Sequence, residues 1–282
     1  MCGVTKLRNE IYVLCRTVNP KYVIGVFENR NKFERQRKIP LTDVGSCTDI
    51  GSCEKENCLY ISDSTRRCIW KLTGGTDDEH KIIKWLTTDY QPMTLSVSTG
   101  GQLLMVNNSS SILVIYGPNA ELIRSIQLST NIKSPIHAVE TSVGNVIVLC
   151  NDFPENGKKG QLGGLIGREQ TKWVLSELNG DGQMVIRRII PSNEAETLID
   201  PRYLSLDSDD RVFVADYLTN RVILLDSDLK CNRILCPTKE EEEEGANIVQ
   251  PHRLCYDEEE KQLIVGGTNF LGEGIQVYTL RQ

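Results

Sequence analysis

The sequence has no long apolar segment. No run approaches the length of about 18 residues that a membrane-spanning helix needs. The opening stretch MCGVTKLRNEIYVLCR is interrupted by charge too early to act as a secretory signal. We therefore expect no membrane partner, and we predict a cytoplasmic location.

Histidine and the common catalytic motifs are also scarce. The chain has three histidines, and His80 is predicted to lie at the rim, away from His137 and His252, whereas a catalytic zinc usually takes three protein ligands. The ten cysteines form no CxxC pair, and most lie in apolar phrases, where a reduced cysteine packs as a small hydrophobe. No GxSxG motif or phosphate-loop lysine occurs. We predict no metal, no cofactor and no enzymatic activity.

The composition is that of a folded protein. Hydrophobic residues make up 39% and charged residues 25% of the 282 residues, a balance typical of soluble globular chains. The formal net charge is −6, which repels nucleic acid on average. We therefore expect no DNA partner.

One phrase recurs along the chain. Bursts of alternating apolar residues such as EIYVLCR, CLYISDS and RVFVADY return at intervals of about 43 to 66 residues, a period typical of propeller blades. Proline precedes four of the units, at the first position of a strand, where its missing N–H is tolerated. The centres of the six bursts are Tyr12, Tyr60, Leu104, Ile147, Phe213 and Ile264.

Each burst is accompanied by further short segments with strand composition. An apolar segment precedes it, a third follows it, and in five units a fourth completes the set. Four antiparallel strands cannot cover both faces of their own sheet, so neighbouring units must stack, and a closed ring protects their edges. This pattern predicts an all-β, six-bladed β-propeller of four-stranded antiparallel blades in a single domain, 1–282, whose last blade lacks its outer strand. The predicted blades are approximately 1–44, 45–88, 89–130, 131–192, 193–247 and 248–282.

Two units resemble the NHL repeat. The segment DPRYLSLDSDDRVFVADYLTNRVILLDSDLK, residues 200–230, has the order of this repeat, and GSCEKENCLYISDSTRRCIWKLTGG is similar to it. Asp63 matches Asp216 and Arg67 matches Arg221, whereas Asn107 replaces the aspartate in the third unit. The other units are degenerate.

The resemblance implies a function. NHL propellers include the C-terminal domains of tripartite-motif (TRIM-NHL) ubiquitin ligases, some of which bind proteins and some single-stranded RNA. Related propellers include an amidating lyase and calcium-dependent lactonases. Nothing here resembles the RING or B-box modules of the ligases, so the resemblance implies their recognition part. We also expect that the natural protein begins before Met1, because the last unit stops at GIQVYTLRQ and lacks a closing strand.

The candidate binding face is the one where the chain enters each first strand and where second strands turn into third strands. Arginine and tyrosine there are suited to anchor a partner. Asp63 with Arg67 and Asp216 with Arg221 are expected to be structural turn pairs. The candidate contact residues are His137, Arg202, Tyr203, His252, Arg253, Arg66, Asn107, Tyr217 and Asn220.

These residues lead to three functional hypotheses. The first is a non-catalytic platform that holds a protein or peptide partner. The second is single-stranded RNA binding, which requires Arg66, Arg67, Arg202, Arg221 and Arg253 to gather in one basic face. The third is a metal-dependent lyase or lactonase, for which few carboxylates are expected near the channel, chiefly Glu140 and Asp207.

Overall fold

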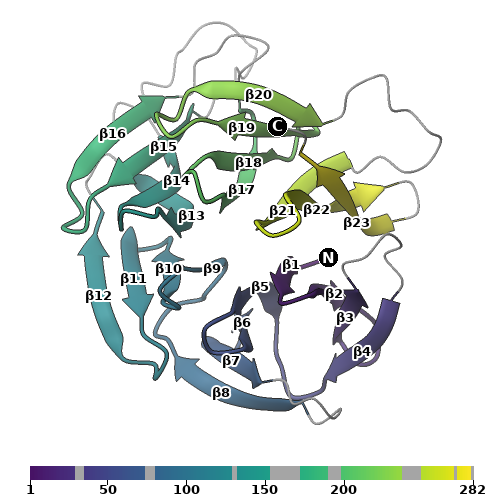
Figure 1. Cartoon of the computed structure of the whole chain (residues 1–282). Coiled ribbons are helices and arrows are strands. Elements are labelled where there is room, and N and C mark those ends of the chain that lie inside the picture. Colours follow the sequence, from purple (N-terminus) through teal and green to yellow (C-terminus); the bar gives the residue numbers. More distant parts are fainter. Residues whose placement is uncertain are drawn as a thin grey trace, which may run out of the picture.

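A computed structural model describes residues 1–28, 35–73, 80–128, 132–152, 172–189, 198–236, 249–269 and 272–280. These residues form six antiparallel sheets arranged around a central axis (Figure 1). Five sheets have four strands and the last has three, so the predicted six-bladed propeller with an incomplete last blade is confirmed. No helix among the described residues is long and apolar enough to cross a membrane.

Each blade consists of strands that are consecutive in the sequence and paired in order from the axis outward. The first blade is β1 (Gly3–Leu7), β2 (Glu10–Arg16), β3 (Tyr22–Glu28) and β4 (Arg35–Leu41). The second is β5 (Cys47–Cys53), β6 (Cys58–Asp63), β7 (Cys68–Thr73) and β8 (Lys81–Thr87). The third is β9 (Leu95–Val97), β10 (Leu103–Asn107), β11 (Ile112–Tyr116) and β12 (Leu122–Gln127).

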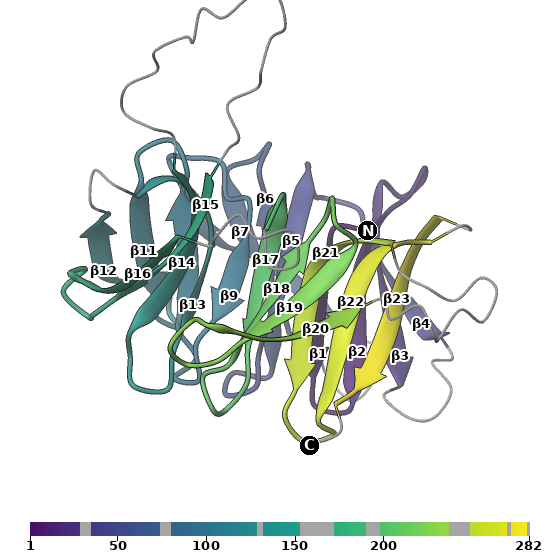
Figure 2. The ribbon, with the colours of Figure 1, turned by 90° about the horizontal axis from the view of Figure 1, so that it is seen from above.

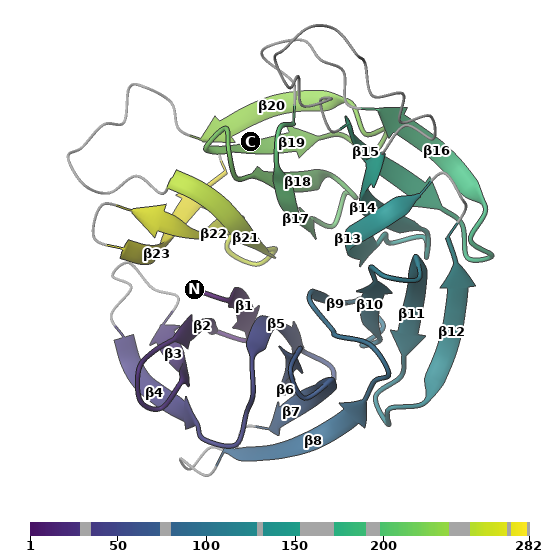
Figure 3. The ribbon, with the colours of Figure 1, turned by 180° about the vertical axis from the view of Figure 1, so that it is seen from behind.

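The second half of the chain repeats this arrangement (Figure 3). The fourth blade is β13 (Lys133–Glu140), β14 (Val146–Asp152), β15 (Lys172–Leu178) and β16 (Met184–Ile189). The fifth is β17 (Pro201–Leu206), β18 (Val212–Asp216), β19 (Arg221–Leu225) and β20 (Cys231–Cys236). The sixth is β21 (Val249–Asp257), β22 (Gln262–Asn269) and β23 (Gly272–Thr279).

The core lies between the blades. The described residues form six clusters of buried apolar side chains, and each contains residues of two adjacent blades. In β6 every residue is buried, because alternate side chains point to opposite faces of the sheet: Leu59 and Ile61 pack towards the first blade, and Cys58 and Tyr60 towards the third. The apolar bursts of the sequence are therefore the second strands, which are covered on both sides.

The first and last blades close the ring through side chains. Met1 is buried with Ile264 of the last blade, and the Lys6 ammonium lies 2.6 Å from Asp257. Close approach at the axis requires a small residue at position 3, because a Cβ on Gly3 would lie 2.7 Å from the Ile50 side chain of β5. The first strand thus sits directly between the last and second blades.

Candidate functional site

A buried ion pair links the first strands of the second and sixth blades. Arg253 on β21 places its Nε 3.2 Å from Oδ1 of Asp49 on β5, whose side chain is fully buried. The same guanidinium donates hydrogen bonds to the backbone oxygens of Cys2, at 2.7 Å, and Thr48, at 2.8 Å. Burial of both charges is tolerated because their hydrogen-bonding capacity is largely used.

Two aromatic rings extend this contact to the remaining blades. The Tyr203 hydroxyl lies 3.1 Å from both Asp49 Oδ2 and the backbone oxygen of Leu95. The His137 ring stacks on Tyr203, with 3.9 Å between the centroids. The Leu204 amide donates to His137 Nδ1 at 3.3 Å, and His137 Nε2 lies 3.2 Å from the Leu95 oxygen. This arrangement fits a neutral imidazole that donates from Nε2.

We call Asp49, His137, Tyr203 and Arg253 the axial plug. Burial raises the pKa of Asp49 from 3.8 to about 6, although the Arg253 charge and hydrogen bonds from Leu95, Ile50 and Tyr203 oppose this rise. Burial lowers the pKa of His137 from 6.5 to about 3. Near neutral pH the plug therefore holds an ionised carboxylate and an uncharged imidazole.

Three residues of the axial plug were predicted to lie on the exposed binding face, but they are largely buried. His137 and Tyr203 retain 1% and 6% of their accessible surface, and the Arg253 side chain retains 14%. Tyr203 was expected to be exposed, and this expectation is wrong because its hydroxyl is needed by Asp49 inside the channel. These three residues link blades, and they do not lie on an open surface.

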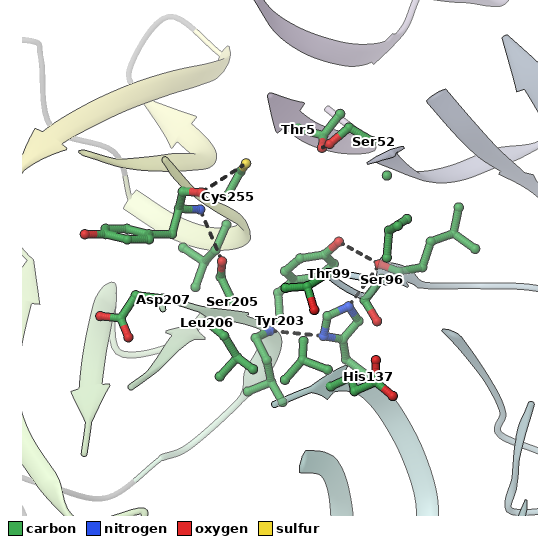
Figure 4. A pocket seen from close by; sticks show the side chains of 18 of the residues that line it. Thr5, Ser52, Ser96, Thr99, His137, Tyr203, Ser205, Leu206, Asp207 and Cys255 are labelled. Carbon is green, nitrogen blue, oxygen red and sulfur yellow. Dashed lines mark hydrogen bonds between the residues drawn. The ribbon is translucent and has the colours of Figure 1, made fainter. Parts of the chain in front are cut away.

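A pocket of about 340 Å³ opens on one side of the plug (Figure 4). Its lining comes from the ends of the six first strands and from the turns that lead into the second strands. We call this the inner-hairpin face, and Figure 2 shows the strands running between it and the opposite face. His137 and Tyr203 form part of the floor, and Val97, Val139 and Leu206 contribute apolar wall.

Hydroxyl groups surround the pocket. Five blades contribute the hydroxyl of a serine or threonine, and the last blade contributes the phenol of Tyr256. Thr5 donates to Ser52 at 2.8 Å, and Ser205 accepts from the Tyr256 amide at 3.2 Å. The aliphatic hydroxyl residues of the lining are Thr5, Ser52, Ser96, Thr99, Ser142, Ser205 and Ser208.

Four carboxylates complete the part of the lining that the structure describes, and three of them have partners there. Asp207 accepts from Arg211 at 2.7 Å, Asp210 accepts from Ser142 and Glu258 accepts from Ser208. The latter two contacts join the hairpins of adjacent blades. The fourth carboxylate, Glu140, has no hydrogen-bond or ion-pair partner among the described residues.

The pocket lining is acidic. Of the described residues that line it, none is lysine or arginine. His137 in the floor adds no positive charge, because it is neutral above about pH 3, and the Arg253 guanidinium behind Tyr203 is paired with the Asp49 carboxylate. The site is therefore suited to a positively charged group with an apolar stem.

The opposite face brings together some of the predicted contact residues. The Arg202 guanidinium lies over the Tyr217 ring at 5.5 Å, and Tyr217 meets the His252 ring edge-on at 6.3 Å. Burial lowers the pKa of His252. Arg202 also pairs with Asp200 at 2.7 Å. This cluster lies on the fifth and sixth blades.

Of the other predicted contact residues, Arg66 and Asn107 lie on other blades, whereas Asn220 adjoins that cluster, because its partner Gln250 also contacts the His252 ring through its backbone oxygen. Arg66 donates to the backbone oxygen of Asp43 and lies over the Trp70 ring. Asn107 accepts from amides of its own turn, and Asn220 accepts from the Gln250 amide at 2.8 Å. The arginines proposed for RNA binding are therefore divided between separate blades, and Arg253 is inside the channel.

The predicted turn aspartates bind backbone. Asp63 accepts from the amides of Gly45, Ser46 and Arg66 and from the Trp70 indole. Although burial acts to raise its pKa, these hydrogen bonds hold the pKa of Asp63 below its usual value. No ion pair joins Asp63 to Arg67 among the described residues.

Asp216 has the same place in its blade. It accepts from the amides of Ile199 and Asp200 at 3.0 and 2.8 Å, and the Arg221 guanidinium lies 4.0 Å away. Both aspartates thus fix the segment that leads into the first strand of their own blade.

No metal centre is apparent in the part of the chain that the structure describes, where no three His, Cys, Asp or Glu residues are grouped as metal ligands.

Asp49 was missed by sequence reasoning. Its signal was a lone carboxylate inside the otherwise uncharged strand CTDIGSC, at a position where a buried charge requires a partner.

The chain matches no protein-family model and no curated protein sequence. Its fold is similar to that of hydrazine synthase from Kuenenia stuttgartiensis, with a TM-score of 0.61 and 12% identity over 99% of this chain and 95% of that chain. Virginiamycin B lyase from Staphylococcus aureus has a TM-score of 0.55 and 12% identity over 99% and 84%. A chain of a nidogen/laminin complex has a TM-score of 0.58 and 14% identity over 84% and 80%.

These similarities correct one prediction. We expected no enzymatic activity because catalytic motifs are scarce, but similar propellers occur in a lyase and in hydrazine synthase. The prediction that the protein is not an enzyme is therefore wrong, because propellers with a similar fold include enzymes and the scarcity of catalytic motifs does not exclude activity. At 12–14% identity the comparisons establish a six-bladed β-propeller fold and no particular reaction.

Proposed function

We propose that the protein binds a polypeptide partner and that the pocket beside the axial plug takes a positively charged side chain of that partner. The observation that carries this proposal is the acidic, partly apolar lining without a cationic residue. One similar propeller comes from a complex of two proteins, nidogen and laminin, so this architecture is compatible with partner binding.

The chemistry of the lining fits lysine or arginine. Both have an aliphatic stem that packs on apolar surface while the charged head stays near polar groups. Val97 and Leu206 offer such a surface, and Glu140 offers a carboxylate without a competing partner among the described residues. The volume of about 340 Å³ lies within the range of binding sites, about 300–1,000 Å³.

The repeat family is a further part of this proposal. We infer that the blades are NHL-type, because Asp63 and Asp216 occupy the matching position and accept two backbone amides from the segment before their first strand. The cluster of Arg202, Tyr217 and His252 stays the alternative contact surface. The cytoplasmic location stays a prediction.

A displayed library of random heptapeptides tests the function. Peptides selected on the protein are expected to be enriched in lysine or arginine and to bind less tightly as salt is raised. Glu140→Gln, which keeps the shape of the side chain, is expected to weaken the selected peptides by about fivefold. Affinities are measured by calorimetry after circular dichroism has shown that the variant is folded.

Glu260→Gln is the matched control, because Glu260 is exposed in the turn between β21 and β22 and does not line the pocket. It makes the same change of charge on the same face. Selection of no peptide, of peptides without cationic enrichment, or equal weakening by both variants would contradict the proposal. If Tyr217→Ala weakened binding of the selected peptides and Glu140→Gln did not, the binding site would be assigned to the opposite face.

A further inference from the structure

One wall of the pocket beside the axial plug contains a glycine in the middle of a strand. Gly51 lies in β5 and lines the pocket. Glycine weakens the interior of a strand, because it loses more conformational freedom on folding than other residues and packs no side chain. Such a glycine marks a bulge or bend, a close approach of another backbone, or a close approach of a ligand.

The backbone of Gly51 gives no reason for glycine. The described glycines with positive φ are Gly101, Gly144 and Gly182, so Gly51 does not need the left-handed region. The irregularity in the pairing of β5 with β6 lies between Cys47 and Asp49, before Gly51. A residue with a side chain could therefore adopt the same backbone conformation in regular register.

The protein atoms around Gly51 give no reason either. A Cβ at this position would lie 3.5 Å from Cγ2 of Val97 and 3.8 Å from Cβ of Leu95, which are ordinary contact distances. Apart from its chain neighbours, no other described residue comes within 4 Å, so the ring of the paired residue Tyr60 does not cover it. Gly3 in β1 differs, because a Cβ there would collide with β5. Of the three explanations for Gly51, the approach of a ligand is left.

Gly51 belongs to a layer of small residues around the pocket. Each first strand contributes the residue that pairs with the centre of the apolar burst in its blade. Figure 4 shows Thr5, Ser96 and Ser205 on different sides of the space. We call these six residues the inner ring, and all of them line the pocket: Thr5, Gly51, Ser96, Val139, Ser205 and Cys255.

The inner ring and the axial plug are successive layers along the channel. Each of the four plug residues precedes a member of the inner ring by two positions, and residues two apart on a strand point to the same face. The large side chains of the plug therefore end the pocket, and the small side chains of the inner ring leave its space open. Gly51 is the member of the ring that leaves most room.

We propose that Gly51 is a specificity-determining residue of this pocket, and that its missing side chain leaves room beside Val97 for the aliphatic stem of a bound lysine or arginine. This inference rests on the function proposed above and adds which part of the wall the stem contacts. Val97 supplies apolar surface for the stem. A side chain at position 51 would occupy the same space.

Gly51→Val tests this inference, because valine suits a strand and its Cβ has room. A peptide selected from the displayed library is made with lysine or with 2,4-diaminobutyrate, which has the same charge on a shorter stem, at its cationic position. We expect the variant to bind the lysine peptide about tenfold more weakly than the unchanged protein does and to bind the diaminobutyrate peptide with little loss. Gly51→Ala adds a smaller group and should have an intermediate effect. Calorimetry measures the affinities.

Urea unfolding provides a second measurement that needs no peptide. Because neither the backbone nor the packing requires glycine at position 51, Gly51→Val should unfold at the same urea concentration as the unchanged protein or at a higher one. A lower midpoint would show that packing requires the glycine and would overturn the proposal. Equal affinity of variant and unchanged protein for the lysine peptide, or equal losses for the two peptides, would also overturn it.

Failure of this inference is distinguishable from failure of the proposed function. If Glu140→Gln weakens cationic peptides and Gly51→Val does not, the pocket takes the cationic side chain and the inference about Gly51 alone is overturned. If the selected peptides show no cationic enrichment, both proposals fail.

Discussion

At the scale of single residues, the axial plug contains two groups whose protonation changes on folding in opposite directions. The buried imidazole of His137 has a pKa of about 3, below 6.5, so the unfolded chain binds more protons between pH 3 and 6.5. His137 therefore reduces the free energy of unfolding as pH falls through that range. The buried carboxyl of Asp49, with a pKa of about 6 instead of 3.8, increases it as pH falls from 6 to 4.

His137→Gln removes the first effect and leaves the second. When the pH falls from 7 to 4.5, the free energy of unfolding of this variant is expected to rise by about 2 kcal/mol relative to that of the unchanged protein. Urea unfolding at both pH values measures the difference. Equal changes with pH in the two proteins would show that His137 is not buried as a neutral group.

At the scale of the strand and its turn, Asp63 and Asn107 provide a comparison of two blades. Both residues end a second strand. Asp63 is buried and holds the amides of Gly45 and Ser46 and the Trp70 indole, whereas Asn107 holds two amides of an exposed turn. When the Asp63 side chain is removed, its buried donors lose their acceptor and water cannot replace it. The amides bound by Asn107 are exposed, so water can bind them instead.

Asp63→Ala is therefore expected to lower the free energy of unfolding by about 3 kcal/mol. Asn107→Ala is expected to cost about 1 kcal/mol or less, because water replaces its side chain. Chemical denaturation at neutral pH measures both values. Similar losses in the two variants would mean that the segment before the second blade is held by other contacts.

The strands themselves could be predicted from the sequence. The second strands are covered on both sides, so their residues form continuous apolar bursts such as CLYISD, which the repeat makes recognisable. The missing outer strand of the last blade was also predicted, because GIQVYTL is the third segment of its unit and no fourth segment of strand composition was recognised after it. Such features depend on neighbours in the sequence.

The candidate site could be predicted only in part. Its residues come from six first strands, so the contact of Asp49 with Arg253 depends on how the ring closes and on side-chain length. The burial of Tyr203 has the same cause. Glu140 was recognised as a carboxylate near the channel, but which end of the channel is open depends on the packing of His137 and Tyr203.

At the scale of the whole molecule, the axial plug joins blades that are distant in the sequence. Arg253 belongs to the last blade, and its guanidinium binds the backbone oxygens of Cys2 and Thr48 and the carboxylate of Asp49. One side chain thus connects the sixth blade with Cys2, which precedes β1, and with β5, the first strand of the second blade. Lys6 and Asp257 add a second link across the same boundary.

Arg253→Gln is expected to lower the free energy of unfolding by about 3–5 kcal/mol, because it leaves the buried Asp49 carboxylate without its counter-charge. Arg202→Gln is the matched control: Arg202 also pairs with an aspartate, but 48% of its side chain is exposed, and such pairs contribute about 0–1 kcal/mol. Urea unfolding measures both losses, and amide exchange should rise in β1 and β21 for Arg253→Gln alone. If the two variants lose the same stability, ring closure depends on the apolar contacts of Met1 and Ile264 and not on the axial plug.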